Sequence, residues 1–162
     1  MDNLLGAIFA LISSVSNPIY QPQPAVDPIV LELREFLVEK KSPLPAETLM
    51  KYPNWQMIVA LSAAESGYGK KLAGDYNAWG IKDFRVSSKN FRGYRNFASW
   101  EESIAYTSEL LFKYDETGSP KPAAMVARWK YIRPFNHWIG NVNYSLNDIQ
   151  ENVIAVAKPK SA

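Results

Sequence analysis

A nearly unbroken apolar stretch at residues 54–66 constrains the fold of this chain more than any other feature. It reads NWQMIVALSAAES, and Glu65 is the only charged residue between Lys51 and Lys70. A helix that is apolar on every side must be covered on every side, so we expect a central, buried helix. The glycines at positions 67 and 69 then predict a sharp backbone turn directly after the acid.

The rest of the chain is also predicted to be mostly helical. Ser99 with Glu102, and Ser145 with Asp148, have the spacing of a capping box, which marks a helix start. Residues 79–97 alternate short polar and aromatic residues, which predicts a small β-hairpin with a turn at 87–90. We expect helices over residues 27–41, 53–66, 99–114, 122–131 and 145–157. With 162 residues, the chain fits one mainly α domain that carries this hairpin.

The N-terminal residues form two segments of different character. Residues 1–16 are apolar but too short for a membrane span, which needs about 20 residues. They carry Asp2 and no basic residue, unlike the usual export signal. Two interpretations stay open, an atypical signal or anchor and a helix that packs on the domain or on a partner. Residues 17–26 form a proline-rich linker, and residues 27–158 form the folded domain.

Composition excludes several kinds of site. The chain has no cysteine and one histidine, His137, which excludes a Cys/His zinc site, a thiol nucleophile and a disulfide framework. His137 is expected in a loop and outside the site. The net charge of +2 comes without a run of basic residues, so nucleic acid is not an expected partner. Neither a metal nor an organic cofactor is implied.

Glu65 is the strongest candidate for a catalytic residue. A carboxyl group that loses contact with water favours its neutral form. An acid that stays protonated can give its proton to a leaving group, which glycosidic cleavage requires. The glycine turn would open a groove beside it. The alternative is an acid at a helix end that simply faces solvent.

Three ordered pieces of this region resemble a known family. They are Glu65-Ser-Gly-Tyr-Gly, the segment Asn77-Ala-Trp-Gly-Ile-Lys, and the stretch FRGYRNFASWEES at 91–103. Together they resemble the endo-β-N-acetylglucosaminidases of glycoside hydrolase family 73, within the lysozyme superfamily. The match covers residues 54–115, with a weaker tail to 150. The resemblance implies a lysozyme-like α+β fold whose β-hairpin lines a glycan groove.

The resemblance also implies an activity and a set of site residues. The activity is cleavage of a β-1,4 bond in the peptidoglycan glycan strand, with Glu65 as general acid. Asn77 and Trp79 match positions that line the groove, and Tyr131 loosely matches a tyrosine near the catalytic acid. Further tyrosines expected at the groove are Tyr68, Tyr94 and Tyr144. For each aromatic residue, packing in the core is the competing explanation.

The sequence departs from the family pattern in the second catalytic carboxylate. Many of these enzymes use a further acid on the β element, and residues 80–97 offer only Asp83. If Asp83 does not serve, the site has one acid, as in lytic transglycosylases. The sequence leaves hydrolysis, transglycosylation and an inactive wall-binding or structural module as alternatives.

The expected partner follows from the expected substrate. Basic residues gather around the β element, namely Lys70, Lys71, Lys82, Arg85, Lys89, Arg92 and Arg95. They could attract the carboxylates of peptidoglycan peptide stems, although a solvated face explains them as well. We expect a monomer that acts on peptidoglycan, secreted or in the cell envelope, and encoded by a bacterium or a phage. The N-terminal segment could contact a membrane or a larger assembly.

Overall fold

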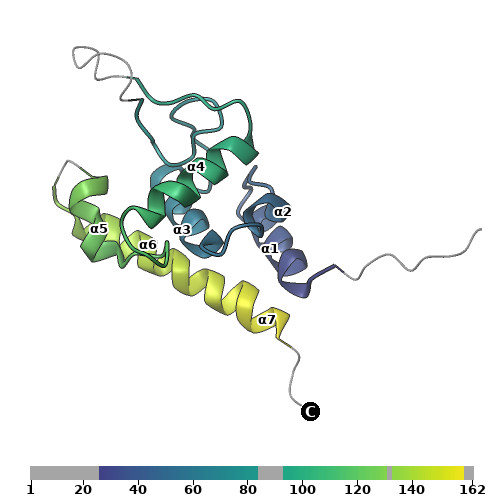
Figure 1. The fold of residues 1–162 in the computed structure, drawn as a ribbon. Coiled ribbons are helices and arrows are strands. Elements are labelled where there is room, and N and C mark those ends of the chain that lie inside the picture. The colour runs from purple at the N-terminus through teal and green to yellow at the C-terminus, as the bar shows by residue number, and fades with distance from the viewer. Residues whose placement is uncertain (1–25, 84–92, 131–132, 159–162) are drawn as a thin grey trace, which may run out of the picture.

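The computed structural model of the chain describes residues 26–83, 93–130 and 133–158, and these residues form a mainly helical fold (Figure 1). The predicted mainly α class is therefore confirmed. In chain order the helices are α1 (Pro28–Glu39), α2 (Ala46–Leu49), α3 (Trp55–Ser66), α4 (Trp100–Phe112), α5 (Pro122–Trp129), α6 (Asn136–Ile149), the π-helical η1 (Gln150–Ile154) and α7 (Ala155–Ala157). Within the described ranges, every helix is too short or too polar to traverse a lipid bilayer. The apolar segment 1–16 and the linker up to residue 25 lie outside them.

Helix α3 is the central element, as its apolar sequence predicts. Ile58, Val59, Ala60 and Leu61 are all fully buried, so consecutive residues point into protein on every side of the helix. Helix α3 packs most extensively against α6 and also contacts α4. In Figure 1 it lies between α4 and the long C-terminal run of α6, η1 and α7.

Two helix starts follow their sequence signals closely. The Asp27 side chain accepts a hydrogen bond from the Ile29 N–H (2.9 Å) and caps α1, and Pro28 fills the first helical position. At α4, the Ser99 hydroxyl accepts from the Glu102 N–H (3.2 Å), and Glu102 accepts from the Ala98 N–H (2.7 Å). Both arrangements satisfy N–H groups that a helix start leaves unpaired.

Helix α6 corrects two predictions. It starts at Asn136, so the expected start at Ser145 is wrong, and His137 lies in its first turn instead of in a loop. Ser145 sits within the helix, where its hydroxyl donates to the Asn141 carbonyl (2.9 Å) one turn earlier. A capping serine would instead accept a hydrogen bond from a backbone N–H, so the Ser145–Asp148 spacing occurs here without a helix start.

The predicted β-hairpin is represented in the described residues by a single antiparallel bridge between Lys82 and Tyr94. Two backbone hydrogen bonds flank it, from the Asp83 N–H to the Gly93 carbonyl (3.1 Å) and from the Arg95 N–H to the Ile81 carbonyl (2.8 Å). The expected turn at 87–90 lies outside the described residues. The bridge places Lys82 and Tyr94 side by side next to the end of α3.

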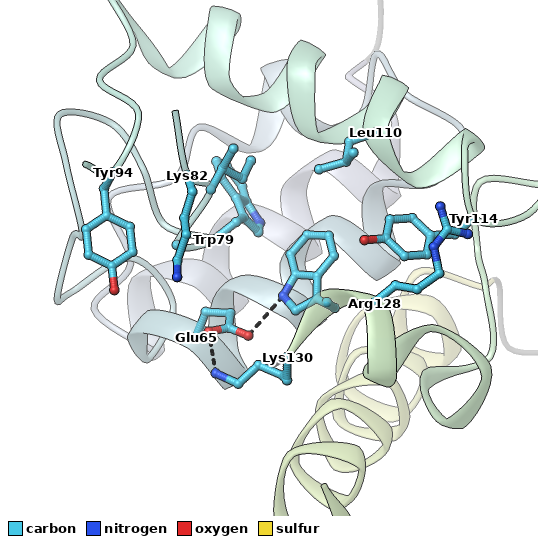
Figure 2. Close-up of a pocket in the computed structure, with 11 residues that line it drawn as sticks. Glu65, Trp79, Lys82, Tyr94, Leu110, Tyr114, Arg128 and Lys130 are labelled. Carbon is cyan, nitrogen blue, oxygen red and sulfur yellow. Dashed lines mark hydrogen bonds and ion pairs between the residues drawn. The ribbon is translucent and has the colours of Figure 1, made fainter. Parts of the chain in front are cut away.

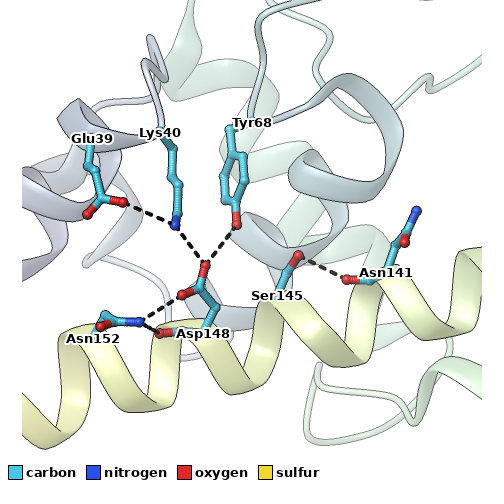
Figure 3. Close-up of polar contacts among 7 residues, drawn as sticks. All are labelled: Glu39, Lys40, Tyr68, Asn141, Ser145, Asp148 and Asn152. Carbon is cyan, nitrogen blue, oxygen red and sulfur yellow. Dashed lines mark hydrogen bonds and ion pairs between the residues drawn. The ribbon is translucent and has the colours of Figure 1, made fainter.

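A polar cluster joins the two ends of the domain (Figure 3). Lys40, directly after α1, forms an ion pair with Asp148 of α6 (3.0 Å). The Tyr68 hydroxyl lies 3.5 Å from the same Asp148 oxygen, and Asn152 donates to the other (2.7 Å). The cluster therefore ties α1, the turn after α3 and the C-terminal helices together.

The cluster shifts two pKa values. Burial alone would lower the pKa of Lys40, but the hydrogen bond and negative charge of Asp148 outweigh it, with smaller contributions from Tyr68 and Glu39, so the pKa lies above its ordinary value of 10.5. For Tyr68, burial raises the pKa above 10.0, and a hydrogen bond to Ser145 opposes part of this rise. Both groups therefore hold their protons more firmly in the folded protein.

Candidate functional site

The turn after α3 is the first determinant of the site. Gly67 caps the helix in the left-handed conformation (φ 60°, ψ 54°), and Tyr68 and Gly69 follow with positive φ angles of 65° and 80°. The Gly67 and Tyr68 N–H groups donate to the carbonyls of Ala63 and Ser62, at 3.0 Å each. These bonds satisfy the last turn of the helix and fix the backbone immediately after Glu65.

Three hydrogen-bond donors surround the Glu65 carboxylate. Its Oε1 accepts from the indole N–H of Trp138 (2.7 Å) and of Trp129 (3.0 Å), and its Oε2 accepts from the Lys130 ammonium (3.1 Å). The Glu65 side chain is only 11% exposed. Trp129 and Lys130 both reach Glu65 from the end of α5, and Figure 2 shows the contact from Lys130. Since α3, α5 and α6 each contribute to this cluster, their packing fixes the position of the carboxylate.

The surroundings of Glu65 differ from the expected apolar setting. An indole N–H and an ammonium group can only donate hydrogen bonds, so all three partners suit the ionised carboxylate. The carboxylate is thus shielded from water by polar contacts.

A pocket with a cavity volume of about 310 Å³ opens beside Glu65. This volume is at the lower end of the range for small-molecule sites, about 300–1,000 Å³. The lining combines one carboxylate, several aromatic rings and three cations. The lining residues are Glu65, Trp79, Gly80, Ile81, Lys82, Tyr94, Leu110, Tyr114, Arg128, Trp129 and Lys130.

Residues 79–81 form one wall of the pocket beside Glu65, and Asn77 supports them from behind. Asn77 is fully buried. Its amide donates to the Ile81 and Arg95 carbonyls (2.8 Å each), and its oxygen accepts from the Ile81 N–H (3.0 Å). We therefore reassign Asn77 from sugar binding to the framework of the loop. Gly80, at φ 64°, brings the backbone close enough that a Cβ there would lie 3.8 Å from Glu65 Oε2.

Trp79 serves both the core and the pocket. It is 1% exposed, and its indole N–H donates to the Ile58 carbonyl (2.9 Å) in α3. It nevertheless lines the pocket. The ring is therefore a rigid part of the pocket wall whose position is set by the core.

The predicted tyrosines separate into three groups. Tyr94 lines the pocket and is 47% exposed, so the structure brings it together with Glu65. Tyr68 belongs to the Lys40–Asp148 cluster (Figure 3), and Tyr144 is 70% exposed on α6. Neither of these two lines the pocket, and their place at a glycan groove stays a prediction. Tyr131 lies outside the described residues, and its assignment stays a prediction.

Asp83 does not share the pocket with Glu65. It is half-buried beside the bridge, and the pocket is lined by its neighbour Lys82 instead. Glu65 is the sole carboxylate among the described residues that line the pocket. Likewise, the described part of the chain holds no group of three or more acidic or histidine side chains placed to bind a metal.

Sequence reasoning missed three residues of the site: Trp129, Lys130 and Trp138. They lie 64, 65 and 73 positions from Glu65 in the chain. One signal could have suggested the tryptophans, because a buried indole N–H needs an acceptor and a buried carboxylate needs donors. That signal says which kinds of residue pair, but not which tryptophan pairs with which acid.

A comparison of the chain with known protein families, with curated proteins and with solved structures finds no match.

Proposed function

We propose that this protein cleaves β-1,4 glycosidic bonds of the peptidoglycan glycan strand, with Glu65 as the general acid. One observation carries the proposal: Glu65 of α3 is the one carboxylate in the described pocket lining, and indoles from α5 and α6 hold it there, shielded from water. A general acid must be fixed within hydrogen-bond reach of the leaving oxygen. In the proposed arrangement, which is lysozyme-like, the hairpin segment around Lys82 and Tyr94 forms one side of the groove.

The lining of the pocket supports a sugar strand as substrate. Aromatic faces such as that of Tyr94 can stack on sugar rings. Lys82, Arg128 and Lys130 supply positive charge, which would attract the carboxylates of peptide stems or of muramic acid. Such a substrate implies action at the cell envelope, by a secreted or phage-encoded protein.

Lytic transglycosylation is the second candidate, and the absence of a second acid from the described lining favours it. Hydrolysis with a second carboxylate needs that group close to the scissile bond, whereas Asp83 lies outside the pocket lining. A transglycosylase needs one acid, since the substrate's own groups complete the reaction. The two reactions differ in the ends of their products.

A wall-binding module without turnover is the third candidate. The Lys130 ion pair favours it, because the ammonium occupies Oε2, the Glu65 oxygen that the two indoles do not contact. This candidate predicts binding to peptidoglycan with no cleavage.

Release of soluble sugar from purified peptidoglycan tests the proposal. We expect release by the wild-type protein and a loss of at least about 100-fold in Glu65→Gln, the lower range for removal of a general acid. Asp83→Asn serves as the matched carboxylate variant, and its activity should stay within about threefold of wild type if Asp83 is no second acid. Co-sedimentation with insoluble wall separates the third candidate, since binding without release would refute cleavage.

A further inference from the structure

Lys130 is held less firmly than the two other partners of Glu65. Trp138 is buried in α6, and Trp129 packs against the core, so moving either indole would unpack the helices. The Lys130 side chain is 37% exposed, and it follows the last residue of α5, where the backbone is extended. Its ammonium can leave Glu65 by rotation about the bonds of a long, flexible side chain.

The charges of the pocket indicate what kind of ligand could displace Lys130 from Glu65. Among the described lining residues, three cations, Lys82, Arg128 and Lys130, stand against the one carboxylate. Such a pocket attracts anions. An anionic group that enters it competes with Glu65 for the Lys130 ammonium.

We propose that Lys130 blocks Glu65 in the free protein and that an anionic sugar displaces it. We call Lys130 a latch in this sense. In the free protein Lys130 pairs with Glu65 Oε2, and on binding it transfers its ion pair to a carboxylate of the glycan strand. The two indoles keep Oε1 in place, so the departure of Lys130 leaves Oε2 to face the sugar strand in the pocket. The latch rests on the proposed function of Glu65, and it narrows the substrate to glycan strands that carry carboxylates.

Two sugars that differ by one group test the latch without any need for turnover. N-acetylmuramic acid carries a lactyl carboxylate that N-acetylglucosamine lacks. In ¹⁵N-labelled full-length protein, the indole N–H resonances of Trp129 and Trp138, assigned with Trp→Phe variants, report on the Glu65 carboxylate. We expect N-acetylmuramic acid to move both resonances and N-acetylglucosamine at the same concentration to leave them in place.

Variants of Lys130 make the binding test sharper. In Lys130→Met without any sugar, both indole resonances should already be displaced in the direction that N-acetylmuramic acid produces in the wild type. Lys130→Arg keeps the charge and should behave as wild type. Lys51→Met, at an exposed position outside both the pocket lining and the basic group around the β element, is the control and should change nothing. Equal responses to both sugars in the wild type, or wild-type indole resonances in Lys130→Met, would overturn the latch.

Kinetics separate a latch from a merely structural lysine. On neutral chito-oligosaccharides, Lys130→Met should raise kcat about tenfold or more, within the usual range of a coupling between two sites. On peptidoglycan the same variant should raise KM. An equal loss of kcat on both substrates would contradict the latch. If the wild type cleaves neither substrate, the proposed function fails, and the indole resonances still decide whether the latch exists.

Discussion

The hydrogen bonds to Glu65 are the residue-scale feature on which the site depends. Trp138 makes the shortest of them and is 6% exposed. A hydrogen bond to a charged group contributes about 1.5–3 kcal/mol. We therefore expect Trp138→Phe to lower the free energy of unfolding by at least about 2 kcal/mol, since packing is lost as well, measured by urea denaturation. Trp100→Phe is the matched control, because Trp100 packs edge-on against Tyr76 and Trp79 and is not one of the three donors.

A double-mutant cycle isolates the interaction between Trp138 and Glu65. Glu65→Leu removes the acceptor at similar size. If the hydrogen bond is as strong as its length suggests, the double variant should lose about 1–3 kcal/mol less unfolding free energy than the sum of the losses in Trp138→Phe and Glu65→Leu. Strict additivity would mean that the contact contributes nothing to stability.

At this scale the sequence predicted the acid but not its environment. Glu65, Trp79 and Tyr94 could be identified because they lie in or beside a local motif and the structure brings them to one pocket. Asn77 belongs to the same motif, yet its side-chain amide forms hydrogen bonds with the backbone of its own loop. Trp129, Lys130 and Trp138 could not be assigned, because their contact with Glu65 arises only when α5 and α6 pack against α3.

Two glycines, one at the end of α3 and one inside α6, should respond to substitution by alanine with opposite changes in stability. Gly67 ends α3 at φ 60°, where an added Cβ meets strain even though space is available. Gly67→Ala should therefore cost about 1 kcal/mol. Gly140 lies inside α6 with nothing within 4 Å of an added Cβ, so Gly140→Ala should stabilise by about 0.5–1 kcal/mol. Thermal and urea denaturation of both variants measure the expected loss and the expected gain of stability. A stabilising Gly67→Ala would refute the described turn.

Helix starts with side-chain caps could be predicted, and the start of α6 could not. Asp27 and Ser99 accept hydrogen bonds from the first turns of α1 and α4. Helix α6 begins after Phe135 without any side-chain cap, so its start leaves no local signal. The short helix α2 and the continuation of α6 into η1 likewise depend on packing, since neither carries a strong signal of its own.

At the scale of the whole molecule, the Lys40–Asp148–Tyr68 cluster predicts sensitivity to alkaline pH. Both pKa values are raised in the folded protein, so the folded state binds these protons more tightly than the unfolded chain does. Their contribution to stability is complete below about pH 10 and is lost as the pH rises through the raised values. Urea denaturation at pH 8, 10 and 11 should show this loss.

Asp148→Asn is the matched variant for the alkaline prediction. It removes the charge that raises the pKa of Lys40 and that adds, after burial, to the raised pKa of Tyr68. The variant should be less stable than the wild type at pH 8, and its stability should fall less between pH 10 and 11. A fall as steep as that of the wild type would show that other groups cause the alkaline loss.

Cleavage of peptidoglycan through Glu65 is a property of the whole molecule with its substrate, and mass spectrometry of digested peptidoglycan tests it. Purified wall is digested with the wild-type protein and with Glu65→Gln, which keeps the size of the side chain but removes the transferable proton. If Glu65 is the general acid, soluble glycan fragments appear with the wild type alone, and their end groups, reducing or anhydro, identify the reaction and the bond cut. The same fragments in equal yield from Glu65→Gln, or none from either protein while wall binding persists, would contradict it.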